Sequence, residues 1–247
     1  MLLGFLATAN TGGSSFAIPT FSGSHAIFGD EKQGYIECYS TGTIIFPKAG
    51  KVDVFVLGSG LKGNTGYVNE SDVRGGKGGN GAVGTTSKSI EVTDGYSATI
   101  TVAATCSSAS TANKSSALGV SANSKASNGG SYGRVNYQTV YNPGKGTDGT
   151  SYPFGETSGI FFKKFGAGGG GGDAGCNWNG YYSTKTANGG TLGGGASKTA
   201  ATANTGSGGG GGSAYNHYSN SGTSVDPDDN AGNGGSGIVI IRWGYAA

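Results

Sequence analysis

Two runs of five glycines, residues 168–172 and 208–212, constrain this chain more than any other feature, and a broken run at 189–195 lies between them. Glycine loses more backbone freedom on folding than any other residue, so an uninterrupted run is unfavourable in an ordinary helix or strand. Such runs form either flexible linkers or backbones that approach more closely than side chains allow. Because the segments between the runs carry a tryptophan and several tyrosines, which flexible linkers lack, the sequence favours close packing.

Close packing of glycine runs predicts a particular backbone conformation. An extended helix with three residues per turn has no internal hydrogen bonds, so every N–H and C=O needs a partner outside its own segment. Neighbouring glycine-rich segments supply these partners when they lie side by side. We therefore predict a packed, polyglycine-II-like lattice. Its structural glycines are expected to include Gly168, Gly170, Gly172, Gly194, Gly208, Gly210, Gly212 and Gly235.

The composition agrees with an ordered but unusual fold. Glycine accounts for 53 of 247 residues, yet only 5 prolines and no strict Gly-X-Y period are present, which excludes collagen. Disorder usually requires a high net charge, and here it is +2. Leu, Ile, Val and Phe number 26 in residues 1–104, 11 in 105–236 and 4 in 237–247. This distribution predicts one hydrophobic core built from the N-terminal part and the last strand.

Strand patterns occur at both ends of the chain. Residues 52–57 are apolar on nearly both faces, as in a central strand, and residues 238–243 form a β-branched run that is its natural partner. An Asp94-Gly95 pair predicts a hairpin turn. We expect an all-β fold with little or no helix: a small N-terminal β-sheet or sandwich, closed by the C-terminal strand and continuing into the glycine-rich lattice. The expected divisions are an attachment tail at 1–15, a β core at 16–104 plus 237–247, and a glycine-rich domain with distal loops at 105–236.

Charge and hydrophobicity exclude several partners. The lysines are scattered without a basic run or a base-stacking repeat, which argues against nucleic acid. No segment approaches the ~18 apolar residues of a membrane span. Residues 1–7 are apolar but lack a basic flank, so we expect a docking tail rather than a signal peptide. Three distant cysteines without a CxxC pair predict reduced thiols and synthesis in a cytoplasm.

Several segments together resemble a known family. They are the strand blocks at 43–47 and 52–58, the glycine-rich return at 75–84, the hairpin at 90–102, and the closing run at 234–242. Over residues 34–243 the chain resembles the glycine-rich domain of bacteriophage tail-fibre and receptor-binding proteins, and it is similar to the polyglycine-sandwich tip adhesins of T-even-like long tail fibres. One departure is Leu57-Gly58-Ser59-Gly60, where the family has more consecutive glycines.

The resemblance implies a location and partners. It implies a virion protein of the tail or another surface appendage, made in the host cytoplasm and bound to other tail proteins through its N-terminal tail. In the family, loops between polyglycine helices bind the host receptor, which here would be a surface glycan or an outer protein. A homo-oligomer is a further option, as is a purely structural role as a fibre spacer or head decoration. A self-assembling surface filament protein is the remaining alternative.

Rigid antiparallel segments would place successive loops alternately at two ends of the molecule. We call the end that residues 52–57 reach the distal end, and the opposite end proximal. The alternation then predicts distal loops at 61–74, 105–126, 173–188 and 213–231, and proximal loops at 134–165 and 196–207. The distal loops hold six candidate receptor-binding residues: Trp178, Tyr181, Tyr182, Tyr215, His217 and Tyr218. Exposed Tyr and Trp among Asn and Ser resemble antibody loops in composition. The alternative interpretation is that these aromatics cap the lattice and shield it from water.

No pattern predicts an enzyme or a cofactor. The acidic cluster at 226–230 lacks the spacing of an EF-hand, so a solvated turn is favoured over calcium. With only His25 and His217, no Ser/His/Asp triad is indicated. The glycine-rich return at 75–81 lacks the Gly-Lys-Ser/Thr of a phosphate-binding loop. We therefore expect no catalytic residue and no metal site.

Overall fold

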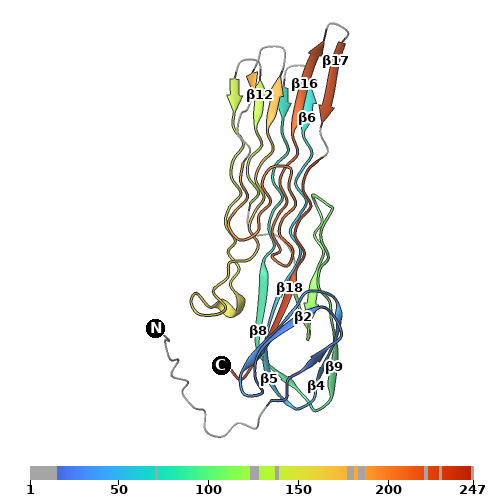
Figure 1. The fold of residues 1–247 in the computed structure, drawn as a ribbon, viewed down its shortest axis with the longest axis vertical. Helices are drawn as coiled ribbons and strands as arrows, with labels where there is room; N and C mark the ends of the chain where they lie inside the picture. The colour runs from blue at the N-terminus through green and yellow to red at the C-terminus, as the bar shows by residue number, and fades with distance from the viewer. Residues whose placement is uncertain are drawn as a thin grey trace.

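The computed structural model describes residues 16–69, 72–122, 128–136, 139–176, 181–182, 187–219, 222–227 and 230–245. The described chain has three parts along its long axis: a β-sheet base, a lattice of extended segments, and a small β-sheet tip (Figure 1). Its one helical element is the 3₁₀ turn Pro153–Gly155. The expected all-β fold is confirmed.

The base contains a five-stranded sheet that the C-terminal strand completes. Its order is β2 (His25–Gly29), β3 (Gly34–Cys38), β18 (Ile238–Trp243), β5 (Gly50–Leu57) and β8 (Gly84–Val92). Strand β18 lies between β3 and β5 and is antiparallel to both, with Ile240 opposite Phe55 and Glu37. The pairing predicted between the closing run and the central strand is therefore correct.

A second, three-stranded sheet packs on one face of the first. It consists of β1 (Thr20–Phe21), β4 (Gly42–Phe46) and β9 (Tyr96–Ile100). The core that includes Ile44, Val54 and Trp243 is fully or almost fully buried. Each such side chain contributes roughly 1.5–3 kcal/mol by leaving water. The hairpin of β10 (Ser115–Ala117) and β11 (Val120–Ala122) adds Ala117 and Ala122 to the same core.

The opposite face of the five-stranded sheet is also covered. Phe55 and Ile240 pack against Phe154 and Phe161, which belong to the excursion at residues 150–165. The central strand is thus buried on both faces, which explains its nearly continuous apolar sequence.

A buried arginine fastens this excursion to the sheet. The Arg242 Nε donates to Asp53 Oδ2 at 2.9 Å, and its Nη1 contacts Glu156. The Arg242 guanidinium lies 4.1 Å from the centroid of the Phe154 ring. The charge of Arg242, whose side chain is only 4% exposed, is therefore paired and hydrogen-bonded, as a buried charge must be.

Backbone hydrogen bonds in the middle of the molecule recur every three residues. The Gly169 N–H donates to the Gly79 carbonyl at 2.9 Å. Three residues later, the Gly172 N–H donates to Gly76 of the same neighbouring segment at 2.8 Å. A period of three, with every partner outside the segment, is what a helix of three residues per turn without internal hydrogen bonds requires. The predicted polyglycine-II-like packing is present.

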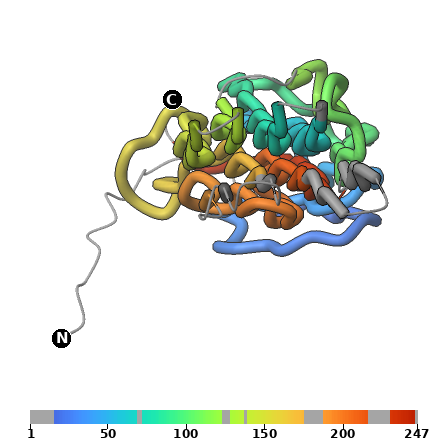
Figure 2. The backbone as a smooth tube through the Cα atoms, turned by 90° about the horizontal axis from the view of Figure 1, so that it is seen from above, coloured from blue at the N-terminus to red at the C-terminus, as the bar shows by residue number. Residues whose placement is uncertain are grey.

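Each run of five glycines is surrounded by six segments. The N–H groups of the first run point to three neighbours and its carbonyls accept from three others. The first run donates to the segments around 75–82, 142–149 and 194–197, and accepts from those around 128–133, 187–190 and 207–213. The second run donates to 58–64, 166–172 and 199–202, and accepts from 75–81, 194–198 and 230–237. Figure 2 looks along these segments.

The close approach of backbones explains why the central segments are all glycine. A Cβ added to Gly169 would lie 2.0 Å from the Gly209 carbonyl oxygen. The segment at 75–81 bonds to fewer neighbours, and every third residue of it, Lys77 or Asn80, carries a side chain. The Lys77 side chain is exposed, and that of Asn80 accepts from the Gly129 N–H. The spacing of glycine therefore reports how many sides of a segment are packed.

The tip consists of two four-stranded sheets. One has the order β13 (Thr139–Tyr141), β12 (Arg134–Asn136), β7 (Asp72–Arg74) and β6 (Tyr67–Asn69). The other has the order β15 (Tyr181–Tyr182), β14 (Ala174–Cys176), β16 (Ala214–Ser219) and β17 (Gly222–Pro227). Val73 and Val135 from the first sheet pack against Ala174 and Ala214 from the second. The sequence predicted loops at these positions. That prediction is wrong, because the structure has eight short strands there.

The predicted alternation of loops fails for two stretches. The described part of the expected distal loop at 105–126, residues 105–122, does not extend to the tip: Ser108 pairs with Lys62 part-way up the lattice, and Asn113 returns beside Ser59. The β10–β11 hairpin then reverses the chain once more. Because of this additional reversal, the segment from Asn128 runs towards the tip rather than away from it. Residues 134–141, expected at the proximal end, therefore form β12 and β13 of the tip, and only the 150–165 excursion lies on the base.

Candidate binding surface at the tip

Five of the six predicted receptor-binding residues belong to one sheet of the tip. Tyr181 and Tyr182 form β15, and β16 contains Tyr215, His217 and Tyr218. Trp178 lies outside the described residues. Of the other five, only Tyr215 has a described side chain. The structure thus brings the backbones of these tyrosines and of His217 into one sheet.

Tyr215 is anchored where the lattice meets the tip. Its hydroxyl donates to the Asp173 carboxylate, which also accepts from the Ser213 hydroxyl. The Lys198 ammonium lies 3.8 Å from Asp173 Oδ1 and 5.5 Å from the centroid of the Tyr215 ring. Burial opposes ionisation of Asp173, but the hydrogen bonds from Ser213 and Tyr215 outweigh it and hold the pKa below its usual value. For Tyr215, these contacts favour the alternative role of closing the lattice end.

The other sheet of the tip presents a row of residues that the sequence analysis did not single out. In the strand register Tyr67 is opposite Arg74, Arg74 is opposite Arg134, and Arg134 is opposite Tyr141. Directly paired residues share a face of an antiparallel sheet. These four residues, which we call the Tyr-Arg row, therefore lie across one face. The valines next to them in sequence point to the tip core.

Asp72 holds both arginines of the row in place. Arg134 makes a bidentate contact with it, from Nε to Oδ1 at 2.7 Å and from Nη2 to Oδ2 at 3.1 Å. Arg74 donates from Nε to Oδ2 at 2.7 Å. Burial raises the pKa of Asp72, but the hydrogen bonds from Arg134 and Arg74 outweigh it and hold the pKa below its usual value. The same bonds raise the pKa of both guanidiniums.

A groove borders the row on the side of the lattice. Its volume is about 440 Å³ and its lining includes Lys77, Tyr132, Arg134 and Tyr141. The Tyr132 ring centroid lies 5.9 Å from the Arg74 Cζ and 5.9 Å from the Lys77 Nζ. Tyr141, at the edge of the sheet, is 53% exposed. The groove is therefore flanked by two tyrosines and carries two cationic side chains.

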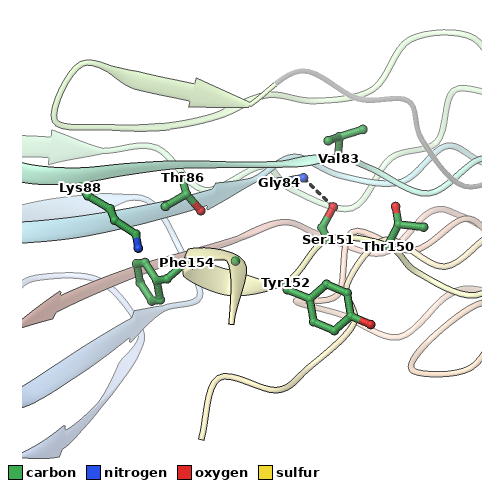
Figure 3. A pocket seen from close by; sticks show the side chains of 9 residues that line it. Val83, Gly84, Thr86, Lys88, Thr150, Ser151, Tyr152 and Phe154 are labelled. Carbon is green, nitrogen blue, oxygen red and sulfur yellow. Dashed lines mark hydrogen bonds between the residues drawn. The ribbon is translucent and has the colours of Figure 1, made fainter. Parts of the chain in front are cut away.

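A second hollow lies beside the base, between β8 and the 150–165 excursion (Figure 3). Its volume is about 570 Å³, and Lys88 is the only charged residue in its lining. The Gly84 N–H donates to the Ser151 hydroxyl at 2.9 Å across it. A single lysine among Thr, Ser and aromatic side chains gives no acid–base pair, so this hollow suggests no chemistry.

Metal and thiol chemistry find little support in the described part of the chain. Within it, no group of three or more His, Cys, Asp or Glu residues is arranged to hold a metal ion. Asp228 and Asp229 of the acidic cluster at 226–230 lie outside it. Cys38 and Cys106 are free and buried, and burial raises the pKa of the Cys38 thiol to about 12. No helix among the described residues is long and apolar enough to cross a membrane.

Comparison with known proteins adds no assignment. No family model matches the chain, and no curated protein is significantly similar to it.

A repeated tripeptide could have revealed the Tyr-Arg row. The four strands read Tyr-Val-Asn, Asp-Val-Arg, Arg-Val-Asn and Thr-Val-Tyr. Each places one valine between two polar or aromatic residues, which is the alternation of a strand with one buried face. At three residues each, these strands fall below the four to eight residues that periodicity detects.

Proposed function

We propose that this protein is a bacteriophage tail-fibre or tail-tip protein that binds a host-surface glycan or outer protein through the tip. One observation carries the proposal. Four β-hairpins from distant parts of the sequence gather at one end of a glycine lattice, and the β base lies at the other end (Figure 1). This arrangement supports the proposal, because it suits a binding surface that is held away from a point of attachment.

The lattice suits a rigid support for such a surface. Its two central segments are cross-linked by backbone hydrogen bonds on all sides and its outer segments to several neighbours each, so the hairpins start from fixed positions. A surface that is ordered before binding loses less conformational entropy on association. The resemblance to tail-fibre tip adhesins supports the same function.

The base has the features expected of an attachment end. Phe16, the first described residue, packs in the base core, and Tyr245 packs against Phe161 on the other face of the sheet. Residues 1–15, which we propose bind other tail proteins, lie outside the described residues. Location in the virion and synthesis in the host cytoplasm belong to the same proposal.

The test is adsorption with a tip variant. A Trp178→Ala/Tyr181→Ala double variant is expected to lose binding to host cells and to stop competing with phage for adsorption to them. Its melting temperature is expected to be unchanged. The control is Ile160→Ser, which alters a 57% exposed residue of the base excursion and is expected to bind normally.

A purely structural virion component would behave differently. The double variant would then adsorb and infect like the unaltered protein, while deletion of residues 1–15 would block incorporation into virions. Normal adsorption by the double variant, together with loss of incorporation on deletion, would replace the proposed function with that structural role.

A further inference from the structure

The Tyr-Arg row and its groove form a second surface of the tip, on the sheet opposite the predicted tyrosines. We infer that this surface binds an anionic saccharide: a sugar ring that bears a carboxylate or a phosphate. The inference deepens the proposed function, because it names the ligand chemistry of the same tip. It rests on the described residues of β6, β7, β12 and β13 and on the adjoining lattice segments.

The arrangement of charge is the first argument. Arg74 and Arg134 are directly opposite each other on neighbouring strands, where like charges destabilise a sheet. The single carboxylate of Asp72 balances only one of them. With Lys77 beside the Tyr132 ring, three positive charges meet one negative charge among the described residues of this surface, which leaves a surplus of two there. An anionic ligand would supply the missing charge.

The geometry of the arginines is the second argument. Arg134 uses its Nε and one Nη2 proton on Asp72, so two of its five N–H donors are engaged there. The edge of the guanidinium that carries Nη1 faces away from Asp72. Planar guanidinium groups match carboxylate and phosphate groups. Because Asp72 already fixes the side chain, little rotamer freedom remains to be lost when a ligand binds.

The aromatic side chains supply the third argument. Tyr132 and Tyr141 line the groove next to Arg134, and Ser131 and Asn142 complete its lining. A tyrosine combines a flat apolar face with a hydroxyl, which suits the apolar face and the hydroxyl groups of a sugar ring. Serine and asparagine add neutral donors and acceptors. Charge, stacking surface and neutral hydrogen-bonding groups therefore converge within one groove of about 440 Å³.

The experiment is a binding titration of the full chain with three probes. Oligogalacturonate supplies carboxylates, its methyl ester supplies the same rings without charge, and phosphomannan supplies phosphates. Binding to oligogalacturonate or to phosphomannan, with at least roughly tenfold weaker binding to the methyl ester, would support the inference. The stronger of the two anionic probes identifies the source of the charge. Equal binding to the methyl ester, or binding to neither anionic probe, would overturn it.

Variants assign the binding to this groove. Tyr141→Ala and Lys77→Gln alter exposed residues outside the tip core. Both are expected to weaken binding of the anionic probes. Loss of a hydrogen bond to a charged group weakens binding roughly tenfold or more, so Arg134→Gln should weaken it more than either of them. Tyr141→Phe keeps the ring and should retain most of the affinity. Lys51→Gln removes an exposed charge at the base and should have no effect. Equal effects of Lys77→Gln and Lys51→Gln would contradict the site.

The outcomes separate this inference from the proposed function. If the protein binds host cells but neither anionic probe competes and Tyr141→Ala binds normally, the inference fails and the receptor-binding function stands. If the protein binds the anionic probes in solution but no host cell, the site is real and the tail-tip function fails.

Discussion

Replacing one central lattice glycine by alanine is the most direct test of the physical basis of this fold. At Gly169 the added Cβ would lie 2.0 Å from the Gly209 carbonyl oxygen, whereas ordinary contact begins near 3.4 Å. The two segments must separate by about the difference, 1.4 Å. Both segments are backbone, so no side chain can rotate away to relieve the contact.

The magnitude follows from the bonds that such a separation strains. Two backbone hydrogen bonds join the two segments directly, from the Gly208 N–H to the Ala167 carbonyl at 2.7 Å and from the Gly211 N–H to the Gly170 carbonyl at 2.9 Å. Each contributes roughly 0.5–1.5 kcal/mol net, and overpacking adds roughly 1–3 kcal/mol. Loss of both bonds with overpacking gives a destabilisation of about 2–6 kcal/mol. Where alanine fits without strain, the same change would stabilise by ~0.4–1 kcal/mol through the unfolded state.

The assay is thermal and denaturant-induced unfolding of Gly169→Ala beside a matched glycine. Gly58→Ala is the control, since its Cβ would be no nearer than 3.0 Å to any atom. In a chain of this size a loss of 1 kcal/mol lowers the melting temperature by ~2–4 °C. We expect Gly169→Ala to melt at least about 5 °C lower and Gly58→Ala to change by less than about 3 °C. Equal melting temperatures for the two variants would refute the claim that backbone contact excludes side chains here.

Three further predictions concern the base and the tip. Arg242→Met leaves the buried carboxylate of Asp53 with the Ser89 N–H but without a positive partner, and should cost ~3–5 kcal/mol, measured by urea unfolding; a loss below 1 kcal/mol would contradict the anchoring role. The pKa of Asp72 and that of Asp173 are lowered in the folded state, so their stabilisation is present above the usual carboxyl pKa and is lost as pH falls through the folded value. In Asp72→Asn the free energy of unfolding should therefore fall less steeply as the pH is lowered into the acid range. An unchanged acid dependence would contradict the prediction. Cys38 should resist iodoacetamide at neutral pH until the protein unfolds, because its thiol is buried with a pKa of about 12; alkylation of the native protein, read by mass spectrometry, would exclude that burial.

The sequence predicts the parts of the fold that depend on strong, local patterns. The β-branched run at 238–243 and the apolar run at 52–57 are long enough to identify as buried partners, and they pair in the structure. The glycine runs predict their own packing because few other arrangements satisfy a bare backbone. The turn predicted at Asp94-Gly95 is present, with Gly95 at a positive φ. The strands it connects, β8 and β9, belong to different sheets and do not pair, so the predicted hairpin is wrong.

The tip could not be predicted in the same way. Its strands are two to six residues long and lie next to glycine segments, so neither periodicity nor length distinguishes them from loops. Arg74 and Arg134 are 60 positions apart, and only the lattice brings them together. A single unforeseen reversal, at the β10–β11 hairpin, inverted the predicted direction of the next segment and moved Tyr141 from the expected proximal end to the tip.

The period of three in the lattice restricts how such a chain can change in length. Inserting one residue within a segment would rotate everything beyond it by a third of a turn, and side chains would then meet backbones that only glycine admits. Insertions within the lattice must therefore come in threes, each lengthening a segment by about 9 Å, and must occur in all neighbouring segments together. Insertions between the paired strands of a tip hairpin are exempt from this rule, because they leave the rotational phase of the lattice segments unchanged. Evolution of such a protein is thus free to insert and delete at one end while its shaft keeps a strict triplet frame.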